Sequence, residues 1–231
     1  FVLFTRCRTT LESVRRDIEM TDSYLPRADY DFSNDPMRID SSDSDPIEQF
    51  RQWFDEEQRC GDHDGNRMAL ATADPDGHPS VRMVLLKKFD TSGWLFFTDY
   101  TSRKASELDQ NPHAALLFHW PRLQRQVRIE GSVAKVSREI SEQYFAQRPR
   151  NSQVGAAASR QSSPLTDRSA FEQQVAKMMD GQDEIHCPES WGGYRLMPER
   201  FEFWQGQPGR THDRVLYLPD SAGWQRSELQ P

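Results

Sequence analysis

The chain has 231 residues, a formal net charge of −7 and 35% hydrophobic residues, with six tryptophans. This composition can bury a sizeable core and is typical of a globular protein rather than a disordered one. The acidic total argues against a general nucleic-acid binder, which needs a basic field over the whole domain. No apolar run approaches the roughly 20 residues of a membrane-spanning helix, so no membrane partner is expected.

Cysteine usage and the N-terminal composition indicate location and organisation. Cys7, Cys60 and Cys187 show no CxxC spacing, so neither a disulfide framework nor a metal site is expected, and a reducing, cytoplasmic location fits best. Residues 1–19 mix Arg with Asp and Glu, which supports a mitochondrial transit peptide poorly. Asp, Ser and Pro dominate residues 20–45 and predict a mobile arm over residues 1–44, before one folded domain over residues 45–231.

The first half of that domain reads as one helix followed mainly by strands. Pro46 suits a first helical position, and the spacing of Ile47, Phe50 and Trp53 predicts a helix that ends near Cys60. A three-stranded meander is expected next, over 68–73, 80–89 and 94–98. A helix over 102–110 and strands over 114–120 and 124–136 follow. Five strands with tight turns indicate a barrel or a sandwich.

The second half adds helices and then returns to strands. Helical signals cover 137–147, 152–159 and 167–179. Strand signals cover 191–197, 200–205, 214–218 and 224–229. No internal repeat and no GxGxxG motif is present, so a doubly wound nucleotide-binding fold is not expected. The predicted class is mainly β with flanking helices.

Two segments of the first half place cations where an anion would stabilise them. Arg82 and Lys87 flank an apolar strand, and a buried cation needs an anionic partner. In a regular strand they point to opposite faces, so one ligand would require a bend, backbone contacts or a subunit interface. Thr98 leads through a hydroxyl-rich turn to a helix start with Arg103 and Lys104, which suits a phosphate. Cations paired with carboxylates and a solvated helix start are the alternatives.

Three further segments carry polar groups that share a face. Gln126 lies on the polar face of an alternating strand and either binds the edge of a heterocycle or is solvated. Tyr144 and Arg148, four residues apart on a helix, form with Ser152 either a phosphate clamp or an exposed polar pair.

The segment 203–214 carries the most specific cluster. Arg210, His212 and Arg214 would share one face of an extended segment, where they repel one another unless an anion or an electron-rich ring lies among them. Such clustering favours a functional site over a purely structural one. No Ser-His-Asp order, HExxH or P-loop pattern accompanies it.

These motifs together resemble the pyridoxamine 5'-phosphate oxidase family. The resemblance spans about residues 45–220 in one order: RMVLLK at 82–87, FFTDYTSRKA at 96–105, RQVRIEG at 125–131, EQYFAQRPRNSQVGA at 142–156, SRQSS at 159–163, WGGYRLMP at 191–198 and FWQGQPGRTHDR at 203–214. Several separated motifs in the same order are far more specific than any one of them.

The resemblance implies an FMN-binding split β-barrel that forms a homodimer through a C-terminal dimerisation segment, with two FMN sites at the subunit interface. The implied reaction converts pyridoxamine or pyridoxine 5'-phosphate to pyridoxal 5'-phosphate in vitamin B6 salvage. A hydride passes from the C4' carbon to the flavin, and O2 reoxidises the flavin to give H2O2, with NH3 released from the amine.

The resemblance also implies site residues, carried over by motif position. The FMN-binding set is Arg82, Met83, Val84, Leu85, Leu86, Lys87, Phe97, Thr98, Arg103, Lys104, Gln126, Gln161, Ser162, Trp204 and Arg214. The substrate-binding set is Lys87, Tyr144, Arg148, Ser152, Arg210, Thr211 and His212. Arg210 and His212 are the catalytic candidates, through positioning and charge stabilisation rather than covalent chemistry.

Two places depart from the family pattern. Glu228 stands where the family commonly has Arg, which reverses the charge of any terminal contact, and Arg27 and Tyr30 match the family's substrate-covering arm only loosely. A non-catalytic split barrel that carries or senses a flavin or pyridoxal phosphate is an alternative that the fold permits, and a nucleic-acid binder is a third. The presence of both a flavin-like set and a substrate-like set favours the oxidase.

Overall fold

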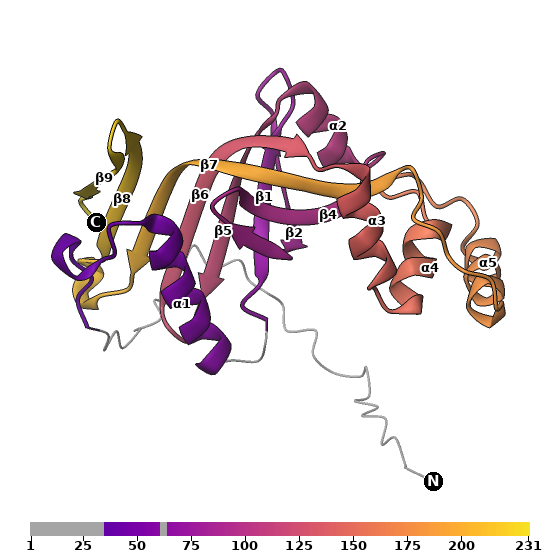
Figure 1. Cartoon of the computed structure of the whole chain (residues 1–231), viewed down its shortest axis with the longest axis horizontal. Helices are drawn as coiled ribbons and strands as arrows, with labels where there is room; N and C mark the ends of the chain where they lie inside the picture. Colours follow the sequence, from indigo (N-terminus) through magenta and orange to yellow (C-terminus); the bar gives the residue numbers. More distant parts are fainter. Residues whose placement is uncertain (1–34, 61–63) are drawn as a thin grey trace, which may run out of the picture. The chain divides into compact units, whose positions relative to one another are not determined.

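An antiparallel sheet forms the body of the part of the chain that this computed structural model describes, residues 35–60 and 64–231. Its nine strands there are β1 (Arg67–Ala73), β2 (Pro79–Leu85), β3 (Lys88–Asp90), β4 (Gly93–Asp99), β5 (His113–Trp120), β6 (Arg125–Lys135), β7 (Trp191–Gln205), β8 (Asp213–Asp220) and β9 (Gly223–Glu228). The strand order is β2-β1-β5-β6-β7-β4-β3, with β8 paired to β7 and β9 (Figure 1). The predicted mainly β class is confirmed.

A two-residue bend closes this sheet on itself. Strands β2 and β3 lie at opposite ends of the strand order, yet Leu86 and Lys87 alone separate them in the chain. The N–H of Leu86 donates to Asn66 O at 2.8 Å beside β1, and the N–H of Lys87 donates to Leu95 O at 2.8 Å on β4. The bend thus joins the two sheet edges, as in a barrel. The single strand predicted over 80–89 is wrong, because the bend divides it into β2 and β3. The two pairings of the predicted meander are present, β1 with β2 and β3 with β4, but they lie at opposite ends of the strand order.

Strand β7 is long enough to pair with β6 along its length, with β4 near its start and with β8 near its end. It has 15 residues, although two strands broken at Pro198 were predicted. A register shift between Glu130 and Gly131 of β6 makes Glu199 an extra, bulged residue, so the proline is accommodated without ending the strand. At roughly 3.3 Å per residue, the strand path from Trp191 to Trp204 is about 40 Å.

Helix α1 (Pro46–Cys60) covers the interior of the curled sheet, as the apolar stripe of its sequence predicts. Phe50 is fully buried, with its ring centroid 4.8 Å from that of Phe89, 5.4 Å from Trp94 and 4.9 Å from Phe118. These partners come from β3, β4 and β5, so one side chain joins the β3 edge of the sheet to its middle. Truncation of such a residue to Ala costs about 3–5 kcal/mol.

The remaining helices lie mostly at one end of β7. They are α2 (Arg103–Gln110), α3 (Arg138–Ala146), α4 (Arg150–Ala158) and α5 (Arg168–Asp180), close to the predicted ranges. Figure 1 shows α3, α4 and α5 beyond β4 and the start of β7, whereas β8 and β9 lie at the other end of β7. None of the helices in the described ranges is long and apolar enough to span a membrane.

The C-terminal hairpin of β8 and β9 holds the chain segment that precedes α1. Met37 is buried, and its N–H donates to Asp213 Oδ2 at 3.0 Å. Arg226 Nη1 donates to Ile39 O at 2.9 Å, and Glu228 Oε1 accepts from the N–H of Ile39 at 3.2 Å. Glu228 therefore has a partner of its own. The predicted arm extends over residues 1–44, of which 1–34, with Arg27 and Tyr30, lie outside the described residues.

Candidate active site

A cavity of about 980 Å³ lies between β2, β4, α2, α3 and α4. It brings together many of the predicted site residues: Arg82, Met83, Val84, Leu85, Lys87, Phe97, Thr98, Arg103, Lys104, Tyr144, Arg148, Ser152, Gln161 and Ser162. The bend after β2 explains how Arg82 and Lys87 reach one cavity. Leu86, by contrast, is buried in the hydrophobic core at 4% exposure.

Lys104 places a buried positive charge at one side of this cavity. Its Nζ donates to three neutral oxygens, Thr98 Oγ1 at 3.0 Å, Ser102 Oγ at 3.2 Å and Gln161 Oε1 at 2.5 Å. Burial, followed by the charge of Arg82, lowers the pKa of Lys104 to about 8. An anion in the cavity would stabilise this ammonium group.

The start of α2 offers further donors beside Lys104. Ser102 is the N-cap residue of α2. Its hydroxyl donates to Asp99 O at 2.6 Å, and its side chain accepts no hydrogen bond from the first N–H groups of the helix. The N–H of Arg103 donates to Ser162 Oγ at 3.3 Å, where Ser162 has a left-handed backbone with φ 71°. Open N–H groups, the helix dipole and two cationic side chains together suit a phosphate group.

Three aromatic side chains, Phe97, Tyr144 and Trp191, form another wall of this cavity. Phe97 and Tyr144 stack with centroids 4.2 Å apart, and Phe97 and Trp191 stack at 5.2 Å. Gly193 permits this packing, because a Cβ there would lie 2.9 Å from the Phe97 ring. Trp191 was not among the predicted site residues, although it is the first residue of the WGGYRLMP motif at 191–198.

Arg148 lies against this wall. Its Cζ is 4.7 Å from the centroid of Trp191, and burial lowers its pKa from the usual value. Its Nη1 is buried and has no hydrogen-bond partner among the described residues. A buried N–H without a partner is costly unless a ligand accepts its hydrogen bond. Lys87 Nζ lies 5.8 Å from the Tyr144 ring, so a second cation faces the same space.

A second group of predicted residues lies on the sheet, outside this cavity. Gln126, Trp204 and Arg214 are direct partners across β6, β7 and β8, so their side chains share one face. The buried core positions beside them are Val127, Phe203 and Val215. The shared face is therefore the one that points away from the core.

The loop between β7 and β8 holds the candidate catalytic residues next to this face. The His212 ring lies 4.6 Å from Trp204, and His212 Nδ1 accepts from the N–H of Gln207 at 3.1 Å. Burial first, and then the charge of Arg210, lower the pKa of His212. The imidazole is thus neutral at pH 7 with its proton on Nε2. Arg210 is exposed and has a left-handed backbone with φ 63°, and Thr211 is also exposed.

The structure does not bring the two groups together within one chain. Over the described ranges, the cavity lining does not include Gln126, Trp204, Arg210, Thr211, His212 or Arg214. Trp191 at the cavity and Trp204 on the sheet face stand near opposite ends of β7, about 40 Å apart along the strand. Within the described chain the two groups therefore remain separate.

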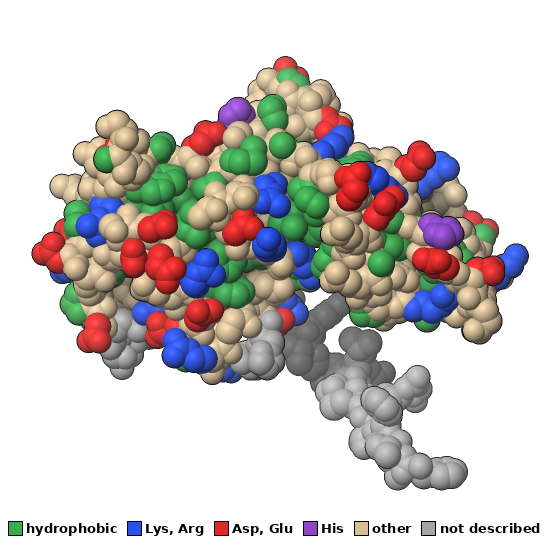
Figure 2. All heavy atoms as spheres, in the orientation of Figure 1, with side chains coloured by type: hydrophobic (Ala, Val, Ile, Leu, Met, Phe, Trp, Pro, Cys, Tyr) green, Lys and Arg blue, Asp and Glu red, His purple; other side chains and the backbone are tan. Residues whose placement is uncertain are grey.

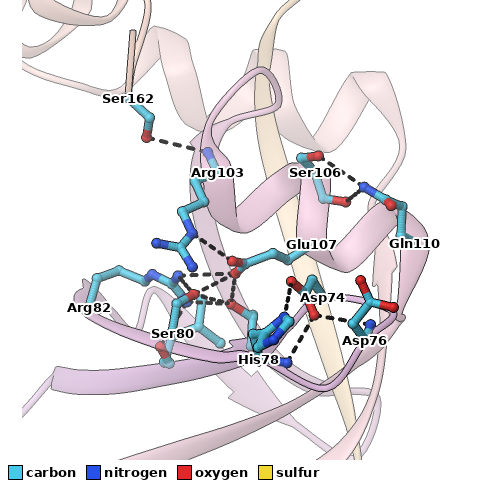
Figure 3. A network of polar contacts seen from close by, with 12 residues as sticks. Asp74, Asp76, His78, Ser80, Arg82, Arg103, Ser106, Glu107, Gln110 and Ser162 are labelled. Atoms are coloured by element: carbon cyan, nitrogen blue, oxygen red, sulfur yellow. Dashed lines mark hydrogen bonds and ion pairs between the residues drawn. The ribbon is translucent and has the colours of Figure 1, made fainter. Parts of the chain in front are cut away.

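Two other charge patterns have ordinary explanations. On the face shown in Figure 2, Lys and Arg side chains are interspersed with Asp and Glu. Asp74, Asp76 and His78 cluster in the turn between β1 and β2, with ligand atoms within 4.8 Å of one another. Asp74 Oδ1 accepts from the N–H groups of Asp76 at 3.0 Å and His78 at 2.9 Å, so the turn itself accounts for this cluster (Figure 3).

Comparison with known proteins defines the class. The chain resembles PhzG from Burkholderia lata, solved with tetrahydrophenazine-1-carboxylic acid, with a TM-score of 0.81 and 30% identity over 85% of this chain and 98% of that one. A pyridoxamine 5'-phosphate oxidase-related, FMN-binding protein from Nostoc punctiforme gives a TM-score of 0.66 at 20% identity, over 80% and 98%. The fold is thus that of the FMN-binding split β-barrel proteins, as predicted.

Sequence comparison defines the family. The pyridoxamine 5'-phosphate oxidase model matches residues 54–180, and the pyridoxine 5'-phosphate oxidase C-terminal dimerisation region matches residues 191–231. A pyridoxine/pyridoxamine 5'-phosphate oxidase of Rubrobacter xylanophilus is 51% identical over 195 residues, 83% of this chain and 89% of its own. Another, from Ralstonia nicotianae, is 50% identical over 204 residues, 87% and 96%.

The chain belongs to the pyridoxamine 5'-phosphate oxidase family. Membership confirms the predicted class of enzyme, an oxidase, and FMN as the predicted cofactor. It also identifies β7 to β9 as a dimerisation region. The residues fit FMN, since the buried Lys104 and the uncapped start of α2 supply donors for a phosphate group.

Proposed function

We propose that this chain oxidises pyridoxamine 5'-phosphate and pyridoxine 5'-phosphate to pyridoxal 5'-phosphate, with O2 as acceptor, in vitamin B6 salvage. One observation carries the proposal: a single cavity has two separate places for an anion, one at Arg103 and Lys104 and one at Arg148. A protein that only carried a flavin would need one phosphate site. The cofactor and the substrate of this reaction each bring a phosphate group.

The start of α2 would hold the cofactor. Arg103, Lys104, Thr98, Gln161 and Ser162 supply charge and hydrogen bonds for the FMN phosphate and its neighbourhood. FMN, when bound, would supply the redox chemistry, as acceptor of two electrons from the C4' carbon and donor of them to O2, which gives H2O2; on the amine route water then hydrolyses the imine to the aldehyde and NH3. The protein therefore has to bind the cofactor and the substrate and to orient the C4' carbon towards the flavin.

The wall of the cavity around Arg148 would hold the substrate phosphate. Arg148 offers the buried, unpartnered Nη1, Lys87 a second charge, and Tyr144 and Ser152 hydroxyl donors. A phosphate dianion satisfies such donors better than water does, because charge-assisted hydrogen bonds are about twice as strong as neutral ones.

The pyridine side would be held by a second copy of the chain. A two-fold dimer repeats every contact, so each subunit can present Gln126, Trp204 and Arg214 and the loop with Arg210 and His212 to its partner's cavity. His212 donates from Nε2 to a ring substituent, and Arg210 stabilises negative charge on the ring. Neither residue needs a covalent step.

The test is oxygen uptake by the purified, FMN-loaded protein given pyridoxamine 5'-phosphate, with the absorbance of the aldehyde product followed in parallel. Joint appearance of both signals supports the proposal. A yellow protein that shows neither signal, with pyridoxine 5'-phosphate also inert, is a flavin carrier or sensor instead.

From the free thiols of Cys60 and Cys187 we also infer a cytoplasmic site of action.

A further inference from the structure

Glu107 of α2 forms the centre of a polar network behind the candidate phosphate site (Figure 3). Its side chain is 6% exposed. Oε1 accepts from Arg103 Nε at 2.8 Å. Oε2 accepts from Thr72 Oγ1 at 2.5 Å, from Ser80 Oγ at 2.6 Å and from Arg82 Nη2 at 3.2 Å. One carboxylate thus joins two strands and a helix to Arg82 and Arg103, two of the three arginines that line the cavity.

The two arginines use their donors differently. Arg82 is 20% exposed, and its Nη1 donates to Leu70 O at 3.0 Å and to Thr72 Oγ1 at 2.5 Å, so its guanidinium is fixed in the cavity wall. Arg103 is 65% exposed, and within the described chain its side-chain hydrogen bond uses Nε, while neither η nitrogen has such a bond. Glu107 thereby turns the fork of Arg103 so that both η groups can meet a ligand.

Glu107 also offsets repulsion among the cations of the cavity. Burial and, to a smaller extent, the charge of Arg103 lower the pKa of Arg82, and burial followed by the charge of Arg82 lowers the pKa of Lys104, so repulsion among the three positive groups adds to the cost of burying them. Burial would raise the pKa of Glu107, but hydrogen bonds from Ser80, Thr72 and Arg103 outweigh it and lower this pKa to about 2. The carboxylate is therefore ionised at every pH at which the protein would work.

We infer that Glu107 is a positioning residue for cofactor recognition: it orients Arg103 and anchors Arg82 so that the cavity selects a phosphorylated flavin over an unphosphorylated one. This inference rests on the proposed placement of the FMN phosphate at the start of α2. Glu107 itself does not line the cavity, so its effect passes through the arginines.

Two effects of removing the carboxylate have opposite signs. Loss of a negative charge near the cations favours any anion through simple Coulomb attraction. Loss of orientation leaves Arg103 mobile and Arg82 without its counter-charge, which disfavours a phosphate. We expect orientation to dominate, because Glu107 contacts both guanidinium groups directly, and the sign of the measured change decides between the two effects.

The experiment removes the flavin from the purified holoenzyme and titrates the protein with FMN and, separately, with riboflavin, following flavin fluorescence. In Glu107→Gln the Kd for FMN should rise about tenfold, as for loss of one charge-assisted hydrogen bond, while the Kd for riboflavin stays unchanged. Glu48→Gln is the matched control. It removes the partner of Arg51, 3.1 Å away in an exposed ion pair on α1, and should change neither value.

A second variant covers the case in which Glu107→Gln does not fold. Thr72→Val keeps the shape of a buried side chain and removes its hydroxyl contacts with Glu107 and Arg82, so the preference for FMN should fall by about threefold. A wild-type ratio of the two Kd values in the folded Glu107→Gln protein, or a ratio shifted toward FMN, overturns the inference. If Glu107→Gln does not fold, a wild-type ratio in Thr72→Val overturns it.

The variant Arg103→Ala distinguishes failure of the role inferred for Glu107 from failure of the proposed phosphate site at the start of α2. If Arg103→Ala abolishes the preference for FMN and Glu107→Gln does not, the site assignment stands and the role of Glu107 is wrong. If Arg103→Ala keeps the full preference, the phosphate binds elsewhere, and the site assignment fails together with the inference.

Discussion

The cavity and the outer sheet face place their cations in opposite surroundings. In the cavity, Lys104 donates to neutral oxygens and Arg148 has a buried nitrogen without a partner. On the sheet face, Arg214 forms an ion pair with Glu202 at 2.7 Å and donates to Gln230 O at 2.9 Å. Burial thus distinguishes Lys104 and Arg148 within one chain, whereas Arg214, which has an ion pair and a hydrogen bond of its own, resembles an ordinary surface residue.

Subunit mixing gives the largest effect and tests whether the two regions belong to different chains of one site. Arg148→Ala and His212→Ala should each lower kcat/KM about 100-fold or more, because each removes a group that holds the substrate. In randomly mixed dimers, a shared interface site leaves about a quarter of the sites with neither substitution, so mixing should restore about 25% of the activity. Oxygen uptake measures the recovery. No recovery after exchange of subunits, verified with differently tagged chains, would show that both groups act within one chain.

Arg210→Ala should separate substrate use from cofactor binding. We expect kcat/KM to fall at least about tenfold while FMN content stays at the wild-type level, because Arg210 is exposed on its loop and lies outside the cavity. Flavin absorbance of the purified protein and initial rates provide the two readings. A protein purified without flavin that becomes normally active on adding FMN would contradict the assignment.

The cavity should also show a pH dependence of cofactor binding through Lys104. Lys104 has a pKa of about 8, so its positive charge is lost as pH rises above this value, and a bound phosphate opposes the loss. The Kd for FMN should therefore rise about twofold from pH 7 to 8 and about tenfold by pH 9.5. Lys104→Met should bind FMN more weakly at pH 7 and show a flat profile. A flat profile in the wild type would mean that Lys104 does not meet the cofactor.

Acid stability gives the smallest effect. The pKa of Glu107 is lowered in the folded state, so its stabilising contribution is present above the unfolded value near 4.5 and is lost as pH falls toward 2. At pH 7, Glu107→Gln should unfold with a free energy about 1–3 kcal/mol below wild type. Urea titrations at pH 7, 4 and 2.5 should show this difference shrinking. A constant difference would mean that the charge of Glu107 does not contribute.

The sequence predicted what depends on neighbouring residues. The stripe of α1, the turn before β4 and the start of α2 all have local signals, and each element lies close to its predicted range. The bend at Leu86 and Lys87 had no such signal, because hydrogen bonds to Asn66, beside β1, and to Leu95, on β4, hold it, and these strands lie near opposite ends of the strand order. Likewise, Pro198 predicted the end of a strand, but a bulge in the pairing of β7 with β6 lets the strand continue through the proline.

The candidate site shows the same limit. Family motifs indicated most of the cavity lining but not which residues share one chain's cavity, since that depends on the length of β7. Glu107 was missed because, four residues after Arg103, it resembles an ordinary exposed helix pair. What distinguishes Glu107 from such a pair is its hydrogen bonds with Thr72 and Ser80, which lie on strands far away in the sequence.

The fastening of residues 37–39 to the C-terminal hairpin has a consequence for biosynthesis. Met37 bonds to Asp213 and Ile39 to Glu228, across 176 and 189 positions of sequence. A ribosome releases the N-terminal part of a chain long before it makes such distant partners, and contacts of this range form late in folding. The segment in front of α1 therefore stays undocked until β8 and β9 have been synthesised, and a chain truncated before β8 lacks both of these partners.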